Sequence, residues 1–190
     1  MLERVPLLSV RQIANPASPF GNWPGTANER LRIAERPGLA IIELAAFRSA
    51  QGNTTALERA LGLLLPGPGA STEAGGIAAL SIGPSCWLII APDADTTRLP
   101  TLPDSAAAIT DLSHGRAVLV LTGPGAVETL MKGTAVDLHP ALFGPGAVAA
   151  TALARMPVVI WRRAAGYDVI VPRSYAASLL EWFIEAGGLS

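Results

Sequence analysis

The spacing of apolar and polar residues changes at about residue 39. Before it, five prolines stand among Asn, Gly and Ser, a pattern that allows neither a long helix nor a central strand. We therefore predict an extended N-terminal arm over residues 1–38, with apolar anchors such as Phe20 and Trp23. From residue 39 to residue 190, short apolar segments alternate with turn residues, which predicts one globular domain.

The first half of this domain is predicted to begin with a strand and a helix. An apolar run over residues 39–47 is typical of a buried strand. Thr55 and Glu58 have the spacing of a capping box, which predicts a helix that begins at about Thr55. The predicted apolar face of this helix comprises Leu57, Leu61 and Leu64.

Two more strands are predicted in the first half. A glycine-rich loop over residues 67–76 leads to apolar runs over 77–82 and 86–91, which a Gly-Pro-Ser turn separates. The first half therefore has the order β-α-β-β.

The same order returns in the second half. A strand over residues 117–121 leads into a helix with Pro124 in its first turn and Gly133 just beyond its end. Further strands are predicted over residues 148–154, 158–161 and 166–171, before a final helix.

Landmark residues of the two halves recur at a nearly constant offset. The offsets are 77 positions for Ile41 and Val118, 74 for Pro66 and Pro140, and 80 for Pro92 and Pro172. We therefore predict an α+β fold with an internal duplication, made of two β-α-β-β units. Each unit buries one sheet face, so it needs the other unit or a partner chain to complete a core.

The composition favours a soluble chain that associates with other chains. Half of the residues are hydrophobic and only 15% are charged, against roughly 25% in an average soluble domain. No apolar run reaches the 18 or so residues of a membrane span, and the N-terminus has no secretory pattern, so we expect a cytoplasmic location. A net charge of −1 gives no long-range field, so neither nucleic acid nor membrane is an expected partner.

Three positions carry candidate chemistry, and we favour a structural interpretation of each. Cys86 is the one cysteine, which excludes an internal disulfide and any cysteine-based metal site within the chain; we expect it to act as a small hydrophobe. Asp111, Ser113 and His114 are predicted to form a turn capped by Asp111 and not a catalytic triad. His139 is predicted to be buried and hydrogen-bonded and not a metal ligand.

Two glycine-rich loops approach a dinucleotide fingerprint without matching it. Residues 123–128 follow a predicted strand, but Glu128 stands at the third glycine position. Residues 144–149 fit the spacing but follow no strand. Lys132 and Gly133 stand in the reverse order of a P-loop. We therefore assign no catalytic, cofactor-binding or metal-ligating residue to this chain.

Several short motifs follow one another along the chain. They are Leu65-Pro66, residues 82–92, residues 111–116, residues 121–124, Lys132-Gly133, Asp137-Leu138-His139-Pro140 and residues 167–174, which include Val171-Pro172-Arg173-Ser174. In this order, from about Ile33 to the C-terminus, the chain resembles the gamma subunit of heterotetrameric sarcosine oxidase. That family is similar to the aminomethyltransferase of the glycine cleavage system, whose folate-binding fold contains paired β-α-β-β units. The predicted duplication agrees with this resemblance.

The resemblance implies a gamma subunit that works with alpha, beta and delta subunits. Such a complex oxidatively demethylates sarcosine or a related N-methyl amine, with tetrahydrofolate as the one-carbon acceptor. FAD, FMN, NAD, tetrahydrofolate and zinc are expected in the partner subunits, and this chain is expected not to be catalytic. Thr134 stands where an iron–sulfur-repair branch of the superfamily has a cysteine. Asp111 is the nearest candidate for a folate-contacting aspartate, but we assign it a turn role.

Two further interpretations stay open. The chain is also compatible with the equivalent subunit of an N-methylglutamate dehydrogenase-type complex, or with an autonomous folate-binding aminomethyltransferase-like protein.

The N-terminal arm has two possible positions. We predict that the segment from Leu7 to Trp23 docks on a partner subunit in extended form; the alternative is that it folds back on its own domain.

Overall fold

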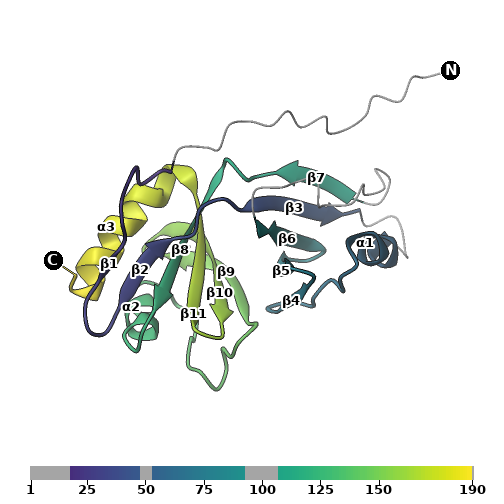
Figure 1. Ribbon diagram of the computed structural model, residues 1–190. Helices are drawn as coiled ribbons and strands as arrows, with labels where there is room; N and C mark the ends of the chain where they lie inside the picture. Colours follow the sequence, from purple (N-terminus) through teal and green to yellow (C-terminus); the bar gives the residue numbers. More distant parts are fainter. Residues whose placement is uncertain (1–17, 48–52, 93–106, 190) are drawn as a thin grey trace.

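Two antiparallel sheets form the centre of the computed structural model, which describes residues 18–47, 53–92 and 107–189 (Figure 1). Sheet I has the strand order β4-β5-β6-β3-β7, and sheet II has the order β1-β2-β8-β11-β10-β9. The strands of sheet I are β3 (Ala40–Ala46), β4 (Ser71–Ala74), β5 (Ile77–Gly83), β6 (Cys86–Ala91) and β7 (Ala107–Asp111). The strands of sheet II are β1 (Thr26–Ala27), β2 (Arg32–Glu35), β8 (Arg116–Thr122), β9 (Val148–Leu153), β10 (Met156–Arg163) and β11 (Gly166–Pro172).

Helices cover the outer faces of the two sheets. Helix α1 (Asn53–Leu61) lies outside sheet I, and helices α2 (Ala126–Met131) and α3 (Ala176–Gly187) lie outside sheet II, with the short helix η3 (Arg173–Tyr175) leading into α3 (Figure 1). The inner faces of the sheets pack on each other. This central core comprises Ile41, Ala78, Leu80, Leu88 and Ile90 from sheet I and Val118, Val148, Val159, Trp161 and Ile170 from sheet II.

The predicted α+β fold with two similar halves is confirmed. Strands β4, β5, β6, β3 and β7 of sheet I follow the same spatial order as β9, β10, β11, β8 and β2 of sheet II. Ile41 and Val118 occupy equivalent positions, since Ile41 pairs with Ile90 and Val118 pairs with Ile170. The first half has one more strand than the predicted β-α-β-β unit, because β4 lies within the segment that the sequence predicted to be a glycine-rich loop. The second half also has three strands after its helix, β9, β10 and β11, and all three were predicted.

An approximate twofold axis passes between Ala70 and Ala147, which form an isolated antiparallel bridge between the halves. These two residues are 77 positions apart, the same offset as Ile41 and Val118. The bridge is flanked by two reciprocal hydrogen bonds of 2.8 Å, from Ser71 N to Gly146 O and from Val148 N to Gly69 O.

The two halves exchange one strand each. Strand β2 precedes β3 in the chain but pairs with β8 in sheet II, and β7 precedes β8 but pairs with β3 in sheet I. Equivalent hydrogen bonds continue each pairing beyond the strand: Leu112 N donates to Ile41 O at 2.8 Å, and Arg36 N donates to Val118 O at 2.9 Å. Each sheet therefore depends on the segment that leads into the other half.

The predicted capping box of the first helix is wrong. Helix α1 begins at Asn53, two residues before Thr55, so Thr55 lies inside the helix. Glu58 instead acts beyond the other end of the helix, where its Oε1 accepts a hydrogen bond from Leu65 N at 2.9 Å. The spacing of Thr55 and Glu58 fits a capping box, but spacing alone does not locate the first helical residue.

The predicted apolar face of this helix is correct for two of its three residues. Leu57 and Leu61 are buried against sheet I. Leu64 is 70% exposed, because the helix ends at Leu61 and Gly62 follows with a positive φ of 64°. Leu63 takes the buried position instead.

The described part of the predicted N-terminal arm packs on the domain. Strands β1 and β2 lie within residues 1–38 and belong to sheet II. Leu31 and Ile33 are buried in the core between sheet II and α3, and Phe20 and Trp23 pack against the same core. Leu31 and Ile33 show the two-residue period of a strand over too short a distance to stand out among prolines. The predicted anchors Leu7, Leu8 and Ile13 lie outside the described residues.

Candidate functional site

Two of the sequence motifs meet where the chain crosses between the sheets. Residues 111–116 connect β7 in sheet I to β8 in sheet II, and Val171-Pro172-Arg173-Ser174 ends β11 beside them. Arg116 pairs with Pro172, and Arg173 N donates a hydrogen bond to Gly115 O at 2.9 Å. The motifs therefore form one continuous structure that joins the two halves.

The turn at residues 111–114 has the structural role that the sequence predicts. Asp111 Oδ1 accepts hydrogen bonds from Ser113 N at 2.9 Å and from Ser113 Oγ at 2.6 Å. Ser113 Oγ also accepts a hydrogen bond from Ile41 N at 3.0 Å, which ties the turn to β3. His114 is exposed. Asp111 thus bonds the serine directly, and the nucleophile–base–orienter series of a triad does not form.

A buried ion pair lies beside this crossover, and sequence reasoning missed it. Asp168 Oδ2 and Arg36 Nη1 are 2.7 Å apart; the Asp168 side chain is 5% exposed and that of Arg36 is 38% exposed. Asp168 lies on β11 among buried apolar residues and faces sheet I, as Ile170 does. Burial raises the pKa of the Asp168 carboxyl, against the lowering effects of the Arg36 and Arg163 charges. A lone acidic residue within the apolar stretch 166–171 was the available signal.

Polar contacts next to this ion pair connect the two sheets. Arg163 Nη2 lies 3.4 Å from Glu73 Oε2, and the Arg163 guanidinium stacks over the Trp161 ring at 3.9 Å from its centroid. Trp161 Nε1 donates a hydrogen bond to Ser71 Oγ at 2.9 Å. Glu73 and Ser71 belong to β4, so the charged and aromatic groups of β10 hold the inner face of the first half against the second.

The loop that resembles a dinucleotide fingerprint binds the chain's own backbone. Gly125 N donates a hydrogen bond to Arg30 O at 2.9 Å, and a Cβ on Gly123 would collide with the same carbonyl. Glu128 forms an ion pair with Arg30 at 2.7 Å. The glycines therefore admit the Arg30 backbone where a fingerprint would admit a pyrophosphate. The residues present do not fit a dinucleotide cofactor here.

The second glycine-rich loop and the Lys-Gly pair also have packing roles. Gly146 has a positive φ of 89° and accepts the hydrogen bond from Ser71 N next to the Ala70–Ala147 bridge. A Cβ on Gly133 would lie 2.6 Å from the Trp182 ring of α3, so only glycine lets α2 end so close to α3.

The predicted burial of His139 is wrong, although its side chain is hydrogen-bonded as predicted. His139 is exposed, and it is the preceding Leu138 that is buried. The His139 backbone N donates to Asp137 Oδ1 at 2.9 Å, and its Nδ1 accepts a weaker hydrogen bond from Ala141 N at 3.3 Å. The apolar residue of the motif anchors the loop, which leaves the histidine at the surface.

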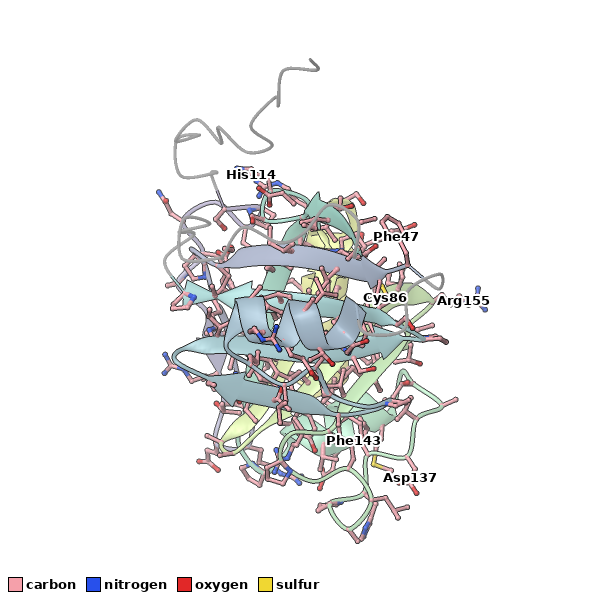
Figure 2. The ribbon with its side chains drawn as sticks, turned by 90° about the vertical axis from the view of Figure 1, so that its right-hand side faces the viewer. Phe47, Cys86, His114, Asp137, Phe143 and Arg155 are labelled. Atoms are coloured by element: carbon pink, nitrogen blue, oxygen red, sulfur yellow. The ribbon has the colours of Figure 1, made fainter. Side chains whose placement is uncertain are left out.

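The candidate reactive side chains lie far apart. Figure 2 shows His114 at the top of the molecule, Cys86 at the side of sheet I, and at the bottom Asp137, whose Oδ1 accepts the hydrogen bond from the His139 backbone. Cys86 is partly buried, and desolvation and then the Glu43 charge raise the pKa of its thiol, which disfavours the reactive thiolate. Within residues 18–47, 53–92 and 107–189, no three His, Cys, Asp or Glu side chains are grouped to hold a metal ion.

The helices of the described segments are all too short or too polar to cross a membrane. This agrees with the absence of a long apolar run from the sequence.

Comparison with known proteins identifies a family. Residues 48–188 match the model of the sarcosine oxidase, gamma subunit family. The chain is 37% identical to the sarcosine oxidase subunit gamma of Corynebacterium sp. (strain P-1) over 143 residues, which cover 71% of this chain and 70% of that protein. It is 32% identical to the same subunit of Corynebacterium sp. (strain U-96) over 173 residues, with 84% of each chain covered.

Solved structures share the fold. A chain of the heterotetrameric sarcosine oxidase from Corynebacterium sp. U-96, in complex with pyrrole 2-carboxylate, matches with a TM-score of 0.72 and 31% identity over 85% of this chain and 86% of that chain. The glycine cleavage system aminomethyltransferase T from Bartonella henselae matches with a TM-score of 0.58 and 14% identity over 80% of this chain and 45% of that one. At this identity, the second match establishes the fold alone.

Proposed function

The chain belongs to the sarcosine oxidase gamma subunit family, and we propose on this premise that it is the non-catalytic gamma subunit of a heterotetrameric sarcosine oxidase-type flavoenzyme. The observation that carries the proposal is the structural match over 86% of a chain in a heterotetrameric sarcosine oxidase. The complex would oxidatively demethylate sarcosine or a related N-methyl amine in the cytoplasm, with tetrahydrofolate as one-carbon acceptor. Alpha, beta and delta subunits would be its partners.

The polar groups at the candidate sites bond to other groups of the same chain, which supports a structural role. Asp168 is paired with Arg36, Asp111 is bonded to Ser113, and the 123–128 loop is filled by the Arg30 backbone. A general acid or base needs a side chain aimed at a substrate position, and these groups are aimed at the chain itself. We accordingly place FAD, FMN, NAD, tetrahydrofolate and zinc in the partner subunits.

Two alternatives differ from this proposal in what the partners do or whether they exist. In an N-methylglutamate dehydrogenase-type complex, this chain would keep the same structural role, because substrate choice would reside in another subunit. In an autonomous aminomethyltransferase-like protein, the chain would bind tetrahydrofolate alone. The fold similarity on which the second alternative rests covers 45% of the aminomethyltransferase chain.

Co-expression tests the proposal. We expect the tagged chain to purify with flavin-containing partners encoded beside it, and the complex to oxidise sarcosine or another N-methyl amine with release of hydrogen peroxide. The isolated chain serves as the control and should show neither flavin absorbance nor bound zinc. Failure of the tagged chain to capture any flavoprotein would contradict the proposal. A tetrahydrofolate-dependent rise in the melting temperature of the isolated chain would favour the autonomous transferase.

A further inference from the structure

The backbone contact between the two halves is the same from either side. The sequence Gly-Pro-Gly-Ala occurs on both sides of the twofold axis, at residues 67–70 and 144–147. The bridge joins Ala70 to Ala147, and the hydrogen bonds that flank it are reciprocal and both 2.8 Å long. Two copies of the first half, or two copies of the second, would therefore form the same backbone contact.

The side chains beside this contact differ between the halves. Ser71 on β4 pairs with Leu80 on β5, and the equivalent residues of the second half are Val148 on β9 and Trp161 on β10. Trp161 Nε1 donates a hydrogen bond to Ser71 Oγ across the two sheets at 2.9 Å. The twofold-related position holds Leu80 and Val148, which are buried in the central core and have no polar side-chain atom.

The two contacts are complementary in size as well as in polarity. The largest side chain of the four, Trp161, meets the smallest, Ser71, while Leu80 and Val148 have intermediate sizes. In a pair of two first halves, Leu80 would meet Ser71 twice and leave unfilled space. In a pair of two second halves, Trp161 would meet Val148 twice, which overpacks the core and leaves the indole N–H without an acceptor.

An ion pair between the sheets also occurs on one side of the axis alone. Arg163 Nη2 of the second half lies 3.4 Å from Glu73 Oε2 of the first half. At the twofold-related position, Ala150 corresponds to Glu73 and Ile82 corresponds to Arg163 along the chain. Pairs of like halves would lose this ion pair. Both of its side chains are partly exposed, so it contributes less to selectivity than the buried contacts do.

We propose that these asymmetric contacts make the two halves selective for each other and prevent two copies of the chain from pairing through like halves. Chains built of similar units are prone to such misassembly, because a unit of one copy can replace the equivalent unit of another. Selectivity arises when the contacts fit in one arrangement and clash or leave space in the others. The inference goes beyond the proposed function and does not depend on it.

A cysteine beside the twofold axis detects pairs of like halves. Ala70 lies opposite Ala147 in the bridge. In a pair of two first halves, residue 70 would therefore lie opposite its own copy, at a Cα separation that suits a disulfide. The background is Ala70→Cys with Cys86→Ser, which removes the native thiol. With the natural contacts, we expect the full-length chain to form almost no disulfide-linked dimer under mild oxidation.

Two double substitutions make the contacts the same in both halves. Val148→Ser with Trp161→Leu gives the second half the residues of the first. Ser71→Val with Leu80→Trp gives the first half the residues of the second. Either change should raise the yield of disulfide-linked dimer at least about tenfold, because like and unlike halves then fit equally well. An unchanged yield in both variants would overturn the inference.

The four substitutions together are the matched control. S71V/L80W/V148S/W161L exchanges the residues of the two halves, so each contact again joins complementary side chains. We expect the dimer yield to return to that of the natural contacts, and the melting temperature to exceed that of both double variants. If a double variant does not fold, the quadruple variant decides. A quadruple variant that dimerises as readily as the double variants, or that fails to fold, would contradict the proposed selectivity.

The cysteine also separates like-half pairing from other kinds of association. A dimer in which each first half packs on the second half of the other copy keeps the natural contacts and places residue 70 opposite Ala147, so it yields no disulfide. Nonspecific aggregation would link cysteines at any exposed position. Glu181→Cys, on the surface of α3, measures this background. Equal gains in dimer for A70C and E181C would overturn the inference.

Discussion

Removal of Arg36 tests whether the ion pair between the sheets stabilises the fold. Arg36→Met keeps the apolar part of the side chain and leaves Asp168 buried without its closest cation. Breaking a buried pair in this way costs about 3–5 kcal/mol. Arg36 retains 38% exposure and the Arg163 charge stays nearby, so we expect a loss below that range, about 2–3 kcal/mol.

The loss should depend on pH in a defined direction. Burial raises the pKa of Asp168 in the folded state, and Arg36 opposes this rise, so R36M raises the pKa further. A carboxyl whose folded pKa lies above its unfolded pKa destabilises the fold when ionised. Protonation relieves the cost as the pH falls from the raised folded value toward the unfolded value of about 3.9. The destabilisation by R36M should therefore be largest near neutral pH and smaller in acid.

Urea unfolding, followed by tryptophan fluorescence at neutral and acidic pH, measures both effects. Arg30→Met is the matched control, because it removes an arginine from an exposed pair, with 63% and 58% of the Arg30 and Glu128 side chains accessible, and should cost at most about 1 kcal/mol. Adding Asp168→Asn to R36M should restore part of the stability, since no charge is then buried. Equal losses for R36M and R30M, or a loss for R36M that does not change with pH, would refute this reasoning.

Three further substitutions or reactions test other features of the chain. Gly123→Ala, which forces a Cβ onto the Arg30 carbonyl, should lower stability well beyond Gly38→Ala, which meets no atom and carries only the cost of a positive φ, about 1–2 kcal/mol; equal melting temperatures would contradict the close approach. Glu58→Ala should cost about 1 kcal/mol in urea unfolding by removing the acceptor for the Leu65 amide, whereas the exposed Glu181→Ala should change little; no difference would argue against this bond. Alkylation of Cys86 should reach half its maximal rate at a higher pH than a free cysteine peptide, and a midpoint at or below the peptide's would disprove the raised pKa.

The duplication could be predicted from the sequence because it rests on long apolar runs that recur in both halves. Apolar runs at positions such as Ile41 and Val118 belong to central strands that are buried on both faces, and such strands leave a strong signal. Short edge elements leave almost none. The four-residue strand β4 was taken for a glycine-rich loop, and β2 was assigned to an arm, because neither is long enough to show an alternation.

The site was harder to predict because its contacts are distant in sequence. Arg36 and Asp168 are separated by 132 positions, and nothing in the local sequence of either residue indicates the other. The turn at Asp111 was predictable, since an aspartate bonds backbone and side-chain groups two residues ahead of it. His139 was misplaced because a motif shows which residues occur together and not which of them faces the core.

The exchange of strands between the halves explains two features that the sequence did not predict, the ion pair of Arg36 with Asp168 and the exposure of Ile109. Because β2 and β7 cross from one sheet to the other, the crossover segments lie side by side, and the chain places Arg36 next to Asp168 directly after one crossing strand. The same exchange puts each crossing strand beyond β3 or β8, at the outer side of its sheet. In sheet II the chain continues outward from β2 to β1 and buries Ile33, whereas in sheet I Ile109 stays partly exposed. Among the described residues, the two halves therefore differ at this edge, where sheet II has β1 beside β2 and sheet I ends at β7.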